Sequence, residues 1–381
     1  MPPPSRSSPP VLIIGAGTIG LSIGWELARA GTPVELFDRG EPGHGATWKA
    51  GGMLAPDAEL QFEEPDLYSL NHESLRRWPS FVNTLERETG VDLGFRTEGT
   101  LTVAPDEDSA TAMERVHRFQ KKVGADVEKL SGAEAREREP FLAPHVAGAV
   151  YTRDAQVNNR ALVRALTAAV EKHFGNIHAQ TAIERVEPDP NRPAIVTSSG
   201  NRMEGRHVIV AAGAWARQLD GLDEELRPPV RPVRGQILEL ESDATFDLRH
   251  VVRGPDAYLV PKSNGRLLVG ATSEEMGFNK EVTAGGLYHL LEGAVDVVPG
   301  IRELPVRSTN VGLRPGTRDN APLLGPSGAP GVTYATGHYR HGILLTPVTA
   351  QEIARFVHSE TVSEWLEPFL PSRFAPSERT S

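Results

Sequence analysis

The most constraining feature of the sequence is a glycine turn between two short apolar runs near the N-terminus. Residues 11–38 read VLIIGAGTIGLSIGWELARAGTPVELFD, an apolar run, the turn, a helical pattern and a second apolar run that ends at Asp38. Gly15 allows a tight bend, Gly17 lets the backbone approach a diphosphate, and Gly20 lets the helix pack closely on the first strand. This order of elements predicts a βαβ unit that binds a dinucleotide.

The helical pattern supports this interpretation independently of the turn. Ile19, Ile23 and Leu27 recur on one face, and Gly31 stands where a C-terminal cap is expected. The free N–H groups at the helix start would hold the diphosphate, and Asp38 would accept hydrogen bonds from the adenosine ribose. The alternative is a glycine turn without a ligand, and the motif leaves NAD and FAD both open. The expected contacts of this unit are Gly15, Ala16, Gly17, Thr18, Ile19, Gly20, Asp38 and Arg39.

The composition excludes several classes of protein. A formal net charge of −10 argues against a nucleic-acid partner, and no apolar run is long enough to span a bilayer. With no cysteine there is no disulfide, no thiolate metal site and no flavin attached through sulfur. We find no metal-binding motif and expect no metal. Residues 1–10 are interpreted as a disordered tail and not a signal peptide, so a cytoplasmic location is expected.

A second segment of small residues follows the second apolar run. Residues 43–56 read GHGATWKAGGMLAP, and here the sequence resembles the D-amino-acid oxidase family, most closely its glycine oxidase branch. In that family such a segment runs along the flavin, because an isoalloxazine ring lies flat on backbone only where side chains are absent. Taken alone, the segment could be a glycine-rich connecting loop. The resemblance implies contacts at Ala46 and Thr47 near the diphosphate, at Ala50, Gly51 and Gly52 along the ring, and at Met53.

Two further stretches extend the resemblance through the chain. Residues 207–215 read HVIVAAGAW, which resembles the second cofactor-facing crossing of these flavoproteins, a strand followed by a helix. Upstream, residues 159–172 show an amphipathic helix pattern, and Ile183 falls at the family's adenine-contacting position. The residues implied to contact the cofactor here are Ile183, Ala212, Gly213 and Trp215.

The strongest similarity is near the C-terminus. Residues 311–326 read VGLRPGTRDNAPLLGP and residues 334–357 read YATGHYRHGILLTPVTAQEIARFV. The second stretch is expected to contain a helix that begins near Gly342 with its positive end toward the flavin. His341 replaces a more usual asparagine, which leaves its side-chain contact open. The cofactor-lining loop of the family corresponds to His338, Tyr339, Arg340, His341, Gly342, Ile343 and Leu344.

The resemblance implies an α/β fold with two discontinuous parts. One is a two-dinucleotide-binding-type, Rossmann-like FAD domain, expected over residues 11–80, 146–225 and 310–365. The other is an α+β substrate domain with a mixed or antiparallel sheet, expected over residues 81–145 and 226–309. A C-terminal tail is expected over residues 366–381.

Four residues are the candidates for substrate contact. Arg314 matches the arginine that binds the substrate carboxylate in glycine oxidase, and the alternative is an ion pair with Asp319. Tyr258 matches a pocket tyrosine able to donate its hydroxyl to the carboxylate, and Arg340 matches a second pocket arginine. Ser273 stands where glycine oxidases have a methionine, so the preferred substrate size is open.

The implied activity is oxidation of a small amine or amino acid by non-covalently bound FAD. Hydride leaves the substrate Cα for flavin N5, the imine hydrolyses to glyoxylate and ammonia, and dioxygen is reduced to hydrogen peroxide. Thiamine thiazole biosynthesis is the expected role. The alternatives are a D-amino-acid or sarcosine oxidase, a dehydrogenase using a quinone, an NAD-dependent dehydrogenase, or a nucleotide-binding protein without activity. Relatives commonly form homo-oligomers, which the resemblance also allows.

Lys49 interrupts the small-residue segment where relatives usually have alanine or another small residue. A cation near the flavin could stabilise the superoxide formed when dioxygen accepts its first electron. The plainer interpretation is that Lys49 points to solvent.

Overall fold

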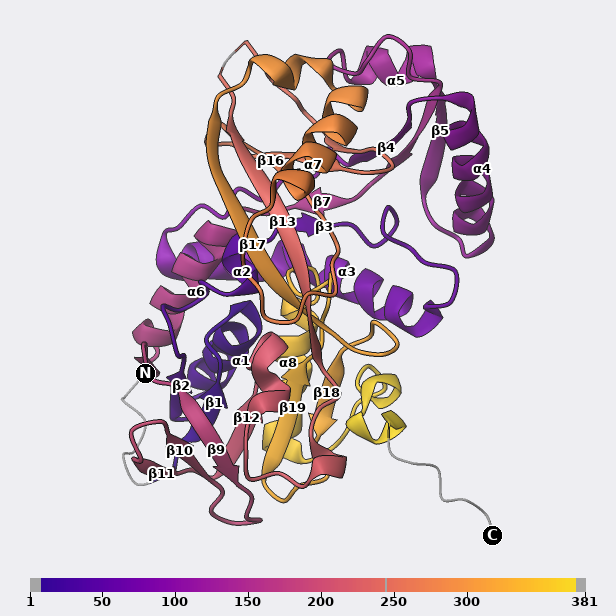
Figure 1. The fold of residues 1–381 in the computed structure, drawn as a ribbon. Coiled ribbons are helices and arrows are strands. Elements are labelled where there is room, and N and C mark those ends of the chain that lie inside the picture. The colour runs from indigo at the N-terminus through magenta and orange to yellow at the C-terminus, as the bar shows by residue number, and fades with distance from the viewer. Residues whose placement is uncertain (1–7, 244, 375–381) are drawn as a thin grey trace.

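The computed structural model describes residues 8–243 and 245–374. The polypeptide forms two halves, each built around one large sheet, and the chain passes between them several times (Figure 1). Residues 1–7 of the expected N-terminal tail and residues 375–381 of the expected C-terminal tail lie outside the described residues. Pro10 is within them, and its carbonyl accepts a hydrogen bond from the Arg206 N–H at 2.9 Å.

The lower half in Figure 1 contains a six-stranded sheet in the order β18-β19-β12-β1-β2-β8. All neighbouring strands are parallel except the β18–β19 pair. The core strands are nearly all apolar, as expected of a parallel sheet that is covered on both faces. The strands are β1 (Val11–Ile14), β2 (Val34–Phe37), β8 (Asn176–His178), β12 (His207–Val210), β18 (Leu323–Pro326) and β19 (Val332–Thr336).

Successive side chains of β1 point to opposite faces of this sheet, and their packing shows what covers each face. Val11 and Ile13 pack with the helices, whereas Leu12 and Ile14 pack with the small sheet on the other face. The helices on the first face are α1 (Thr18–Arg29), α3 (Pro65–Thr89), α6 (Asn159–Lys172) and α8 (Thr346–Ser359). The small sheet on the second face is β9 (Ile183–Glu187), β10 (Ala194–Thr197) and β11 (Arg202–Glu204).

The upper half contains an eight-stranded mixed sheet in the order β17-β13-β16-β15-β14-β4-β6-β5. Its neighbouring strands are antiparallel except for β14 and β4. The strands are β4 (Thr100–Ala104), β5 (Val127–Ser131), β6 (Gly148–Thr152), β13 (Arg231–Glu241), β14 (Val251–Arg253), β15 (Tyr258–Pro261), β16 (Arg266–Gly270) and β17 (Val306–Gly316). Its helices are α4 (Glu107–Lys122), α5 (Gly132–Arg138) and α7 (Ala284–Val297).

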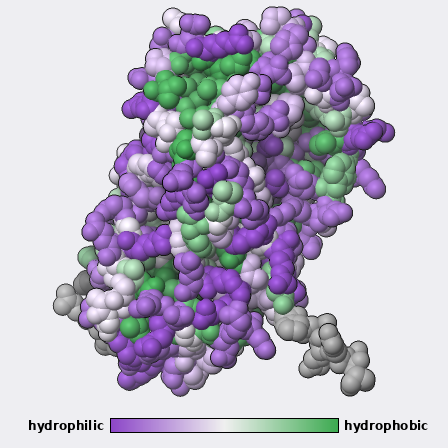
Figure 2. Space-filling model, in the orientation of Figure 1, coloured by the Kyte–Doolittle hydropathy of each residue, from purple (hydrophilic) through white to green (hydrophobic). Residues whose placement is uncertain are grey.

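Short elements complete the chain between and around the two halves. Two of them pair in a two-stranded ribbon, β3 (Met53–Leu54) with β7 (Ala155–Gln156), and α2 (Ala46–Lys49) precedes this ribbon. The 3-10 helices are η1 (Gly213–Gln218), η2 (Glu224–Leu226), η3 (Pro299–Glu303), η4 (Glu367–Phe369) and η5 (Pro371–Phe374). Figure 2 shows a mostly hydrophilic surface with apolar patches, and the exposed apolar residues include Tyr288 of α7 and Val306 of β17.

The strand pairing differs from the expected domain ranges in two places. β6 pairs with β4 and β5, and β17 pairs with β13 along its length, so both belong to the eight-stranded sheet. The ranges 146–225 and 310–365 had placed β6 and most of β17 in the nucleotide-binding part. Sequence pattern cannot reveal this, because an apolar strand carries no mark of the sheet that it joins.

Three local expectations also need correction. The helix expected to begin near Gly342 begins at Thr346, since residues 342–345 form turns and Pro347 occupies the first helical turn, where proline is tolerated. The helix expected after the AlaAlaGly segment is the 3-10 helix η1. Residues 366–374, assigned to a tail, form η4 and η5, and Phe369 is buried in the core.

Candidate active site

A cavity of about 830 Å³ lies between the two halves of the molecule. Residues from both sheets line it, including Gly15 after β1, Trp215 of η1, Tyr258 of β15 and Arg314 of β17. Almost all of the residues that we expected to contact cofactor or substrate line this one cavity. The exceptions are Ala16, Gly20, His341 and Leu344, which lie behind its surface.

The glycine turn at one end of the cavity has the expected geometry. Gly15 has a φ of +105°, and a Cβ there would lie 2.4 Å from the Ala211 carbonyl oxygen. A Cβ at Gly20 would lie 1.8 Å from the Gly15 carbonyl oxygen, so the helix can approach the strand only without a side chain. At Gly17 the nearest atom is Thr47 Oγ1 at 3.5 Å, which leaves the backbone accessible.

Asp38 is fixed beside this turn. One carboxylate oxygen accepts the Ala16 N–H and the other accepts the Gly40 N–H, both at 2.9 Å. Its side chain lines the cavity next to Arg39, whose guanidinium carbon lies 3.6 Å from the centroid of the Trp215 ring. A carboxylate oxygen has more than one acceptor site, so these bonds leave acceptor capacity toward the cavity.

The small-residue segment after α2 forms the middle of the cavity wall. A Cβ on Gly51 would lie 3.3 Å from the Tyr258 ring. Gly52 has a φ of +75°, and a Cβ there would lie 2.2 Å from the Val157 carbonyl oxygen. Backbone therefore forms this part of the wall, because Gly52 excludes a side chain and Gly51 leaves little room for one.

Arg314 faces the cavity from β17. Its Nη1 donates to the Thr272 carbonyl oxygen at 3.0 Å. Within residues 8–243 and 245–374, no carboxylate lies within 4.0 Å of its guanidinium, and Asp319 pairs instead with Arg373 at 2.8 Å. The alternative of an Arg314–Asp319 ion pair is therefore wrong, and the remaining N–H groups of Arg314 are free to bind an anion.

Tyr258 lies close to Arg314 and is half-buried. Burial raises the pKa of its hydroxyl above the usual range, although the positive charge of Arg314 acts in the other direction. The hydroxyl is therefore protonated at neutral pH and can donate a hydrogen bond.

A half-buried acid that lines the same cavity, Glu59, was not expected from the sequence. Glu59 accepts a hydrogen bond from Arg253 Nη1 at 2.9 Å and lies 3.8 Å from His341 Nδ1. Burial acts to raise the pKa of Glu59, but Arg253, His341 and Arg340 outweigh it and hold this pKa below its usual value. Glu59 is thus ionised and paired. No motif marks Glu59 or Arg253, which meet only because β14 faces the loop after β3.

Arg340 and Ser273 also line the cavity. Arg340 is half-buried, and no described carboxylate lies within 4.0 Å of its guanidinium. Ser273 is exposed, and its Oγ is 3.5 Å from the Tyr339 hydroxyl. On either side of Arg340 along the chain, burial lowers the pKa of His338 to about 3 and that of His341 to about 4, so both are neutral at pH 7.

Lys49 lies against β17 and lines the cavity. It is half-buried, and its Nζ donates to Asn310 Oδ1 at 2.9 Å. Burial lowers its pKa, and the nearby charges of Arg160 and Lys280 lower it further against the opposing effect of Glu239. This position differs from the plainer expectation of a side chain in bulk solvent.

The comparisons with known proteins agree with this geometry. Residues 10–356 match the family described as FAD dependent oxidoreductase. The chain belongs to this family. The resemblance to the D-amino-acid oxidase family is thereby confirmed, and FAD is the cofactor.

The glycine oxidase of Geobacillus kaustophilus is 34% identical over 366 residues, which cover 95% of this chain and 96% of that protein. Its crystal structure matches with a TM-score of 0.88 over 96% of this chain and 99% of that chain. The bifunctional protein ThiO/ThiG of Trichormus variabilis is 35% identical over 376 residues, and the match covers 97% of this chain but only 56% of that protein. The crystal structure of an iminodiacetate oxidase from a Chelativorans species matches with a TM-score of 0.84 at 28% identity, over 95% of this chain and 98% of that chain.

This FAD-dependent oxidoreductase has a cavity that suits its cofactor. The accessible backbone at Gly17 and the start of α1 would hold the diphosphate, Asp38 the ribose, and the backbone wall at Gly51 and Gly52 the isoalloxazine ring.

Among the helices of the described residues, none has the length and apolar character needed to span a membrane. In the same residues, no cluster of three or more histidine or acidic side chains could hold a metal ion.

Proposed function

We propose that this protein oxidises glycine and other small amines or D-amino acids to a 2-oxo acid and ammonia, with dioxygen as electron acceptor and hydrogen peroxide as product. The observation that supports this most directly is the unpaired guanidinium of Arg314, which shares the cavity with Tyr258 and the backbone wall at Gly51. An amino acid brings a carboxylate, and a guanidinium is the natural partner of a carboxylate in a water-poor pocket.

The chain's contribution to this reaction is to orient the substrate. Arg314 binds the carboxylate through parallel N–H groups, and Tyr258 adds its hydroxyl as a donor. The chemistry that FAD would supply when bound is acceptance of the substrate Cα hydride and transfer of two electrons to dioxygen. Loss of the hydride from a neutral amine leaves a protonated imine, which water hydrolyses to the 2-oxo acid and ammonium. No general base is required when the amine binds unprotonated, and Glu59, which is paired with Arg253, does not serve as one.

A role in making the thiazole of thiamine is part of this proposal. The imine of glycine is the compound that such a pathway would take from the enzyme. Support comes from the similarity to proteins named ThiO/ThiG, in which a region similar to this chain is joined to a second part.

A second substrate class is suggested by Arg340. Its guanidinium lines the same cavity as Arg314 without a carboxylate partner among the described residues, so Arg314 and Arg340 could each bind one carboxylate of a substrate. An amine with two carboxylates, such as iminodiacetate, would use both. The similarity to an iminodiacetate oxidase supports including it among the substrates.

The test is a substrate panel with purified yellow holoenzyme. Peroxide release is measured in air with glycine, sarcosine, D-alanine and iminodiacetate, and reduction of an artificial dye is measured in parallel. Dye reduction without peroxide would identify a dehydrogenase and contradict the oxidase. No reduction of the flavin by any of the four amines would reject the proposal.

Substitutions of Arg314 and Arg340 test whether the oxidation takes place in this cavity. Arg314→Ala should lower kcat/KM by about 100-fold, because it removes a charge-assisted contact to the substrate carboxylate. Arg318→Ala is the matched control, since Arg318 is exposed and does not line the cavity. Arg340→Ala should weaken iminodiacetate oxidation more than glycine oxidation. An Arg314→Ala enzyme with unchanged kcat/KM would remove Arg314 from the proposed site.

A further inference from the structure

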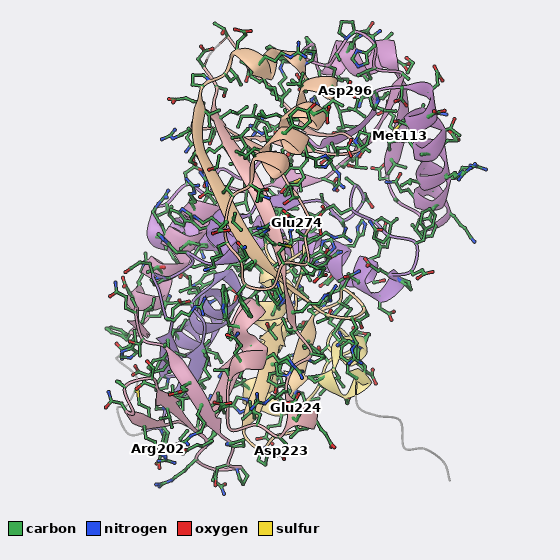
Figure 3. The ribbon with its side chains drawn as sticks, in the orientation of Figure 1. Met113, Arg202, Asp223, Glu224, Glu274 and Asp296 are labelled. Atoms are coloured by element: carbon green, nitrogen blue, oxygen red, sulfur yellow. The ribbon has the colours of Figure 1, made fainter. Side chains whose placement is uncertain are left out.

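The segment of residues 271–283 joins β16 of the eight-stranded sheet to α7, and Ala271, Ser273 and Lys280 of this segment line the cavity. Both ends of this segment are anchored on β13. Near its start, Glu274 forms an ion pair with Arg234 and accepts a hydrogen bond from Gln236 at 2.8 Å. At its end, the Thr283 N–H donates to the side chain of Gln236 at 2.8 Å. Glu274, labelled in Figure 3, lies near the middle of the molecule, between the two halves.

The middle of this segment contacts the other half of the molecule. The Phe278 ring lies 5.5 Å from the ring of Trp215, centroid to centroid, and Lys280 Nζ lies 5.0 Å from the Trp215 centroid. Trp215 belongs to η1, which follows β12 of the nucleotide-binding sheet. The segment is thus supported by one half and touches the other half through an indole ring.

Lys280 is one of three cations in this part of the cavity, with Arg39 and Lys49. Arg39, Lys49 and Lys280 all line the cavity, and within residues 8–243 and 245–374 none of them has a carboxylate within 4.0 Å. Partial burial lowers the pKa of Lys280, and the charge of Arg39 lowers it further. Lys280 in turn lowers the pKa of Lys49. The carboxylate of Asp38 acts on Arg39 and that of Glu239 acts on Lys49, but neither acid forms an ion pair with these cations, so an anion in the cavity would stabilise the three of them further.

The same cavity contains the glycine turn and Asp38, which are the features that suit the dinucleotide part of FAD. The strongest negative charge on FAD is its diphosphate. We propose that Lys280 binds the phosphate groups of FAD, so that the segment of residues 271–283 closes over the cofactor from the substrate-binding half. The inference concerns the cofactor alone and does not depend on which amine is oxidised.

Binding to the apoprotein tests this directly. FAD affinity is measured from quenching of flavin fluorescence, and the affinities of ADP and adenosine are measured by calorimetry. Lys280→Ala should raise the Kd of FAD and of ADP about fivefold, the size expected for a partly exposed ion pair, and should leave adenosine unchanged. Lys280→Arg should stay within about twofold of the native protein, because it retains the charge. Added salt should reduce the difference between native protein and Lys280→Ala.

The control variant is Lys122→Ala at the end of α4, an exposed lysine that does not line the cavity. It should leave all three affinities unchanged. Circular dichroism of each apoprotein shows whether the variants are folded. Equal FAD and ADP affinities in native protein and Lys280→Ala would overturn the proposal, as would an equal loss for adenosine, which would put Lys280 at the nucleoside instead of the phosphates.

Closure of residues 271–283 over the cofactor can be measured separately, by limited proteolysis. Phe278 is 39% exposed, so chymotrypsin should cleave after it in the apoprotein. FAD should slow this cleavage in the native protein, and the protection should be weaker in Lys280→Ala at the same fractional saturation. Cleavage at equal rates with and without FAD would contradict closure.

Discussion

The guanidinium of Arg314 occupies the space that a side chain at Gly235 would fill. The two residues lie on paired strands, where Arg314 is opposite Val233 and Gly235 is opposite Gly312. A Cβ on Gly235 would lie 2.5 Å from Arg314 Nη1 and 2.7 Å from Cζ. The absence of a side chain at residue 235 therefore decides where the proposed carboxylate-binding group can lie.

Gly235→Ala should consequently impair substrate binding without a change in FAD content. The methyl group would displace the Arg314 guanidinium, and we expect kcat/KM to fall by about tenfold or more, mainly through KM. Gly285→Ala is the matched control, because nothing lies within 4 Å of a Cβ there. Steady-state kinetics and the flavin absorbance of the purified variants check the prediction. Native KM in Gly235→Ala would show that Arg314 does not position the substrate.

Ser273→Met should narrow the substrate range. Ser273 lines the cavity with its Oγ 3.5 Å from the Tyr339 hydroxyl, so a longer side chain would occupy space near that ring. We expect kcat/KM for D-alanine to fall relative to that for glycine by about tenfold, the scale of one or two methylene groups in a pocket. Ser273→Ala, which adds no volume, should leave the ratio unchanged. If the ratio of kcat/KM for D-alanine to that for glycine is unchanged in Ser273→Met, residue 273 does not select substrates by size.

Lys49→Met tests the proposed contribution of this cation to oxygen reduction. Methionine retains much of the alkyl stem that packs at Gly312, where a Cβ would lie 3.2 Å from Lys49 Cβ, but it removes the charge. Stopped-flow should show reoxidation by dioxygen slowed by about tenfold, with anaerobic reduction by substrate unchanged. FAD content is measured first, since Lys49 also belongs to the cation group around Lys280. An unchanged rate of reoxidation by dioxygen would show that Lys49 does not contribute to oxygen reduction.

Asp154→Asn should stabilise the protein at alkaline pH. Burial and the neighbouring charge of Asp57 raise the pKa of Asp154 to about 7, far above the value of about 3.9 in an unfolded chain. Between these two values the folded state holds a proton that the unfolded state has lost, so native stability falls as pH rises toward 7. The stability of Asp154→Asn does not fall in this way, because asparagine does not titrate.

Thermal denaturation at pH 4 and pH 8 measures the difference. Native protein and Asp154→Asn should have similar Tm values at pH 4, and the variant should be higher at pH 8 by about 3 °C. The side-chain oxygens of Asp154 accept hydrogen bonds from the Thr152 hydroxyl at 2.5 Å and the Asp57 N–H at 3.4 Å, and asparagine keeps one of these two acceptor oxygens at either pH. Equal Tm shifts at both pH values would indicate a packing effect and not a titration.

Local pattern was sufficient for the nucleotide-binding start and for one complete helix. The glycine spacing predicted the close approach of Gly20 to Gly15, which the structure has, because the cost of a Cβ at a tight turn is a local property. The expected helix over residues 159–172 coincides with α6, since its apolar period continues without interruption and Asn158 caps it. The helix start near Gly342 was wrong because the apolar residues of the preceding turns resemble a helical face.

The sequence by itself determined the family and the βαβ unit, because both depend on residues that are close together along the chain. Tertiary structure alone decided which distant groups meet: Gly235 beneath Arg314, Glu59 with Arg253, and Lys280 beside Trp215. These contacts arise from strand pairing and from segments that pass between two sheets. A single sequence carries no local signal for such pairings, since the same apolar strand pattern is compatible with many partners.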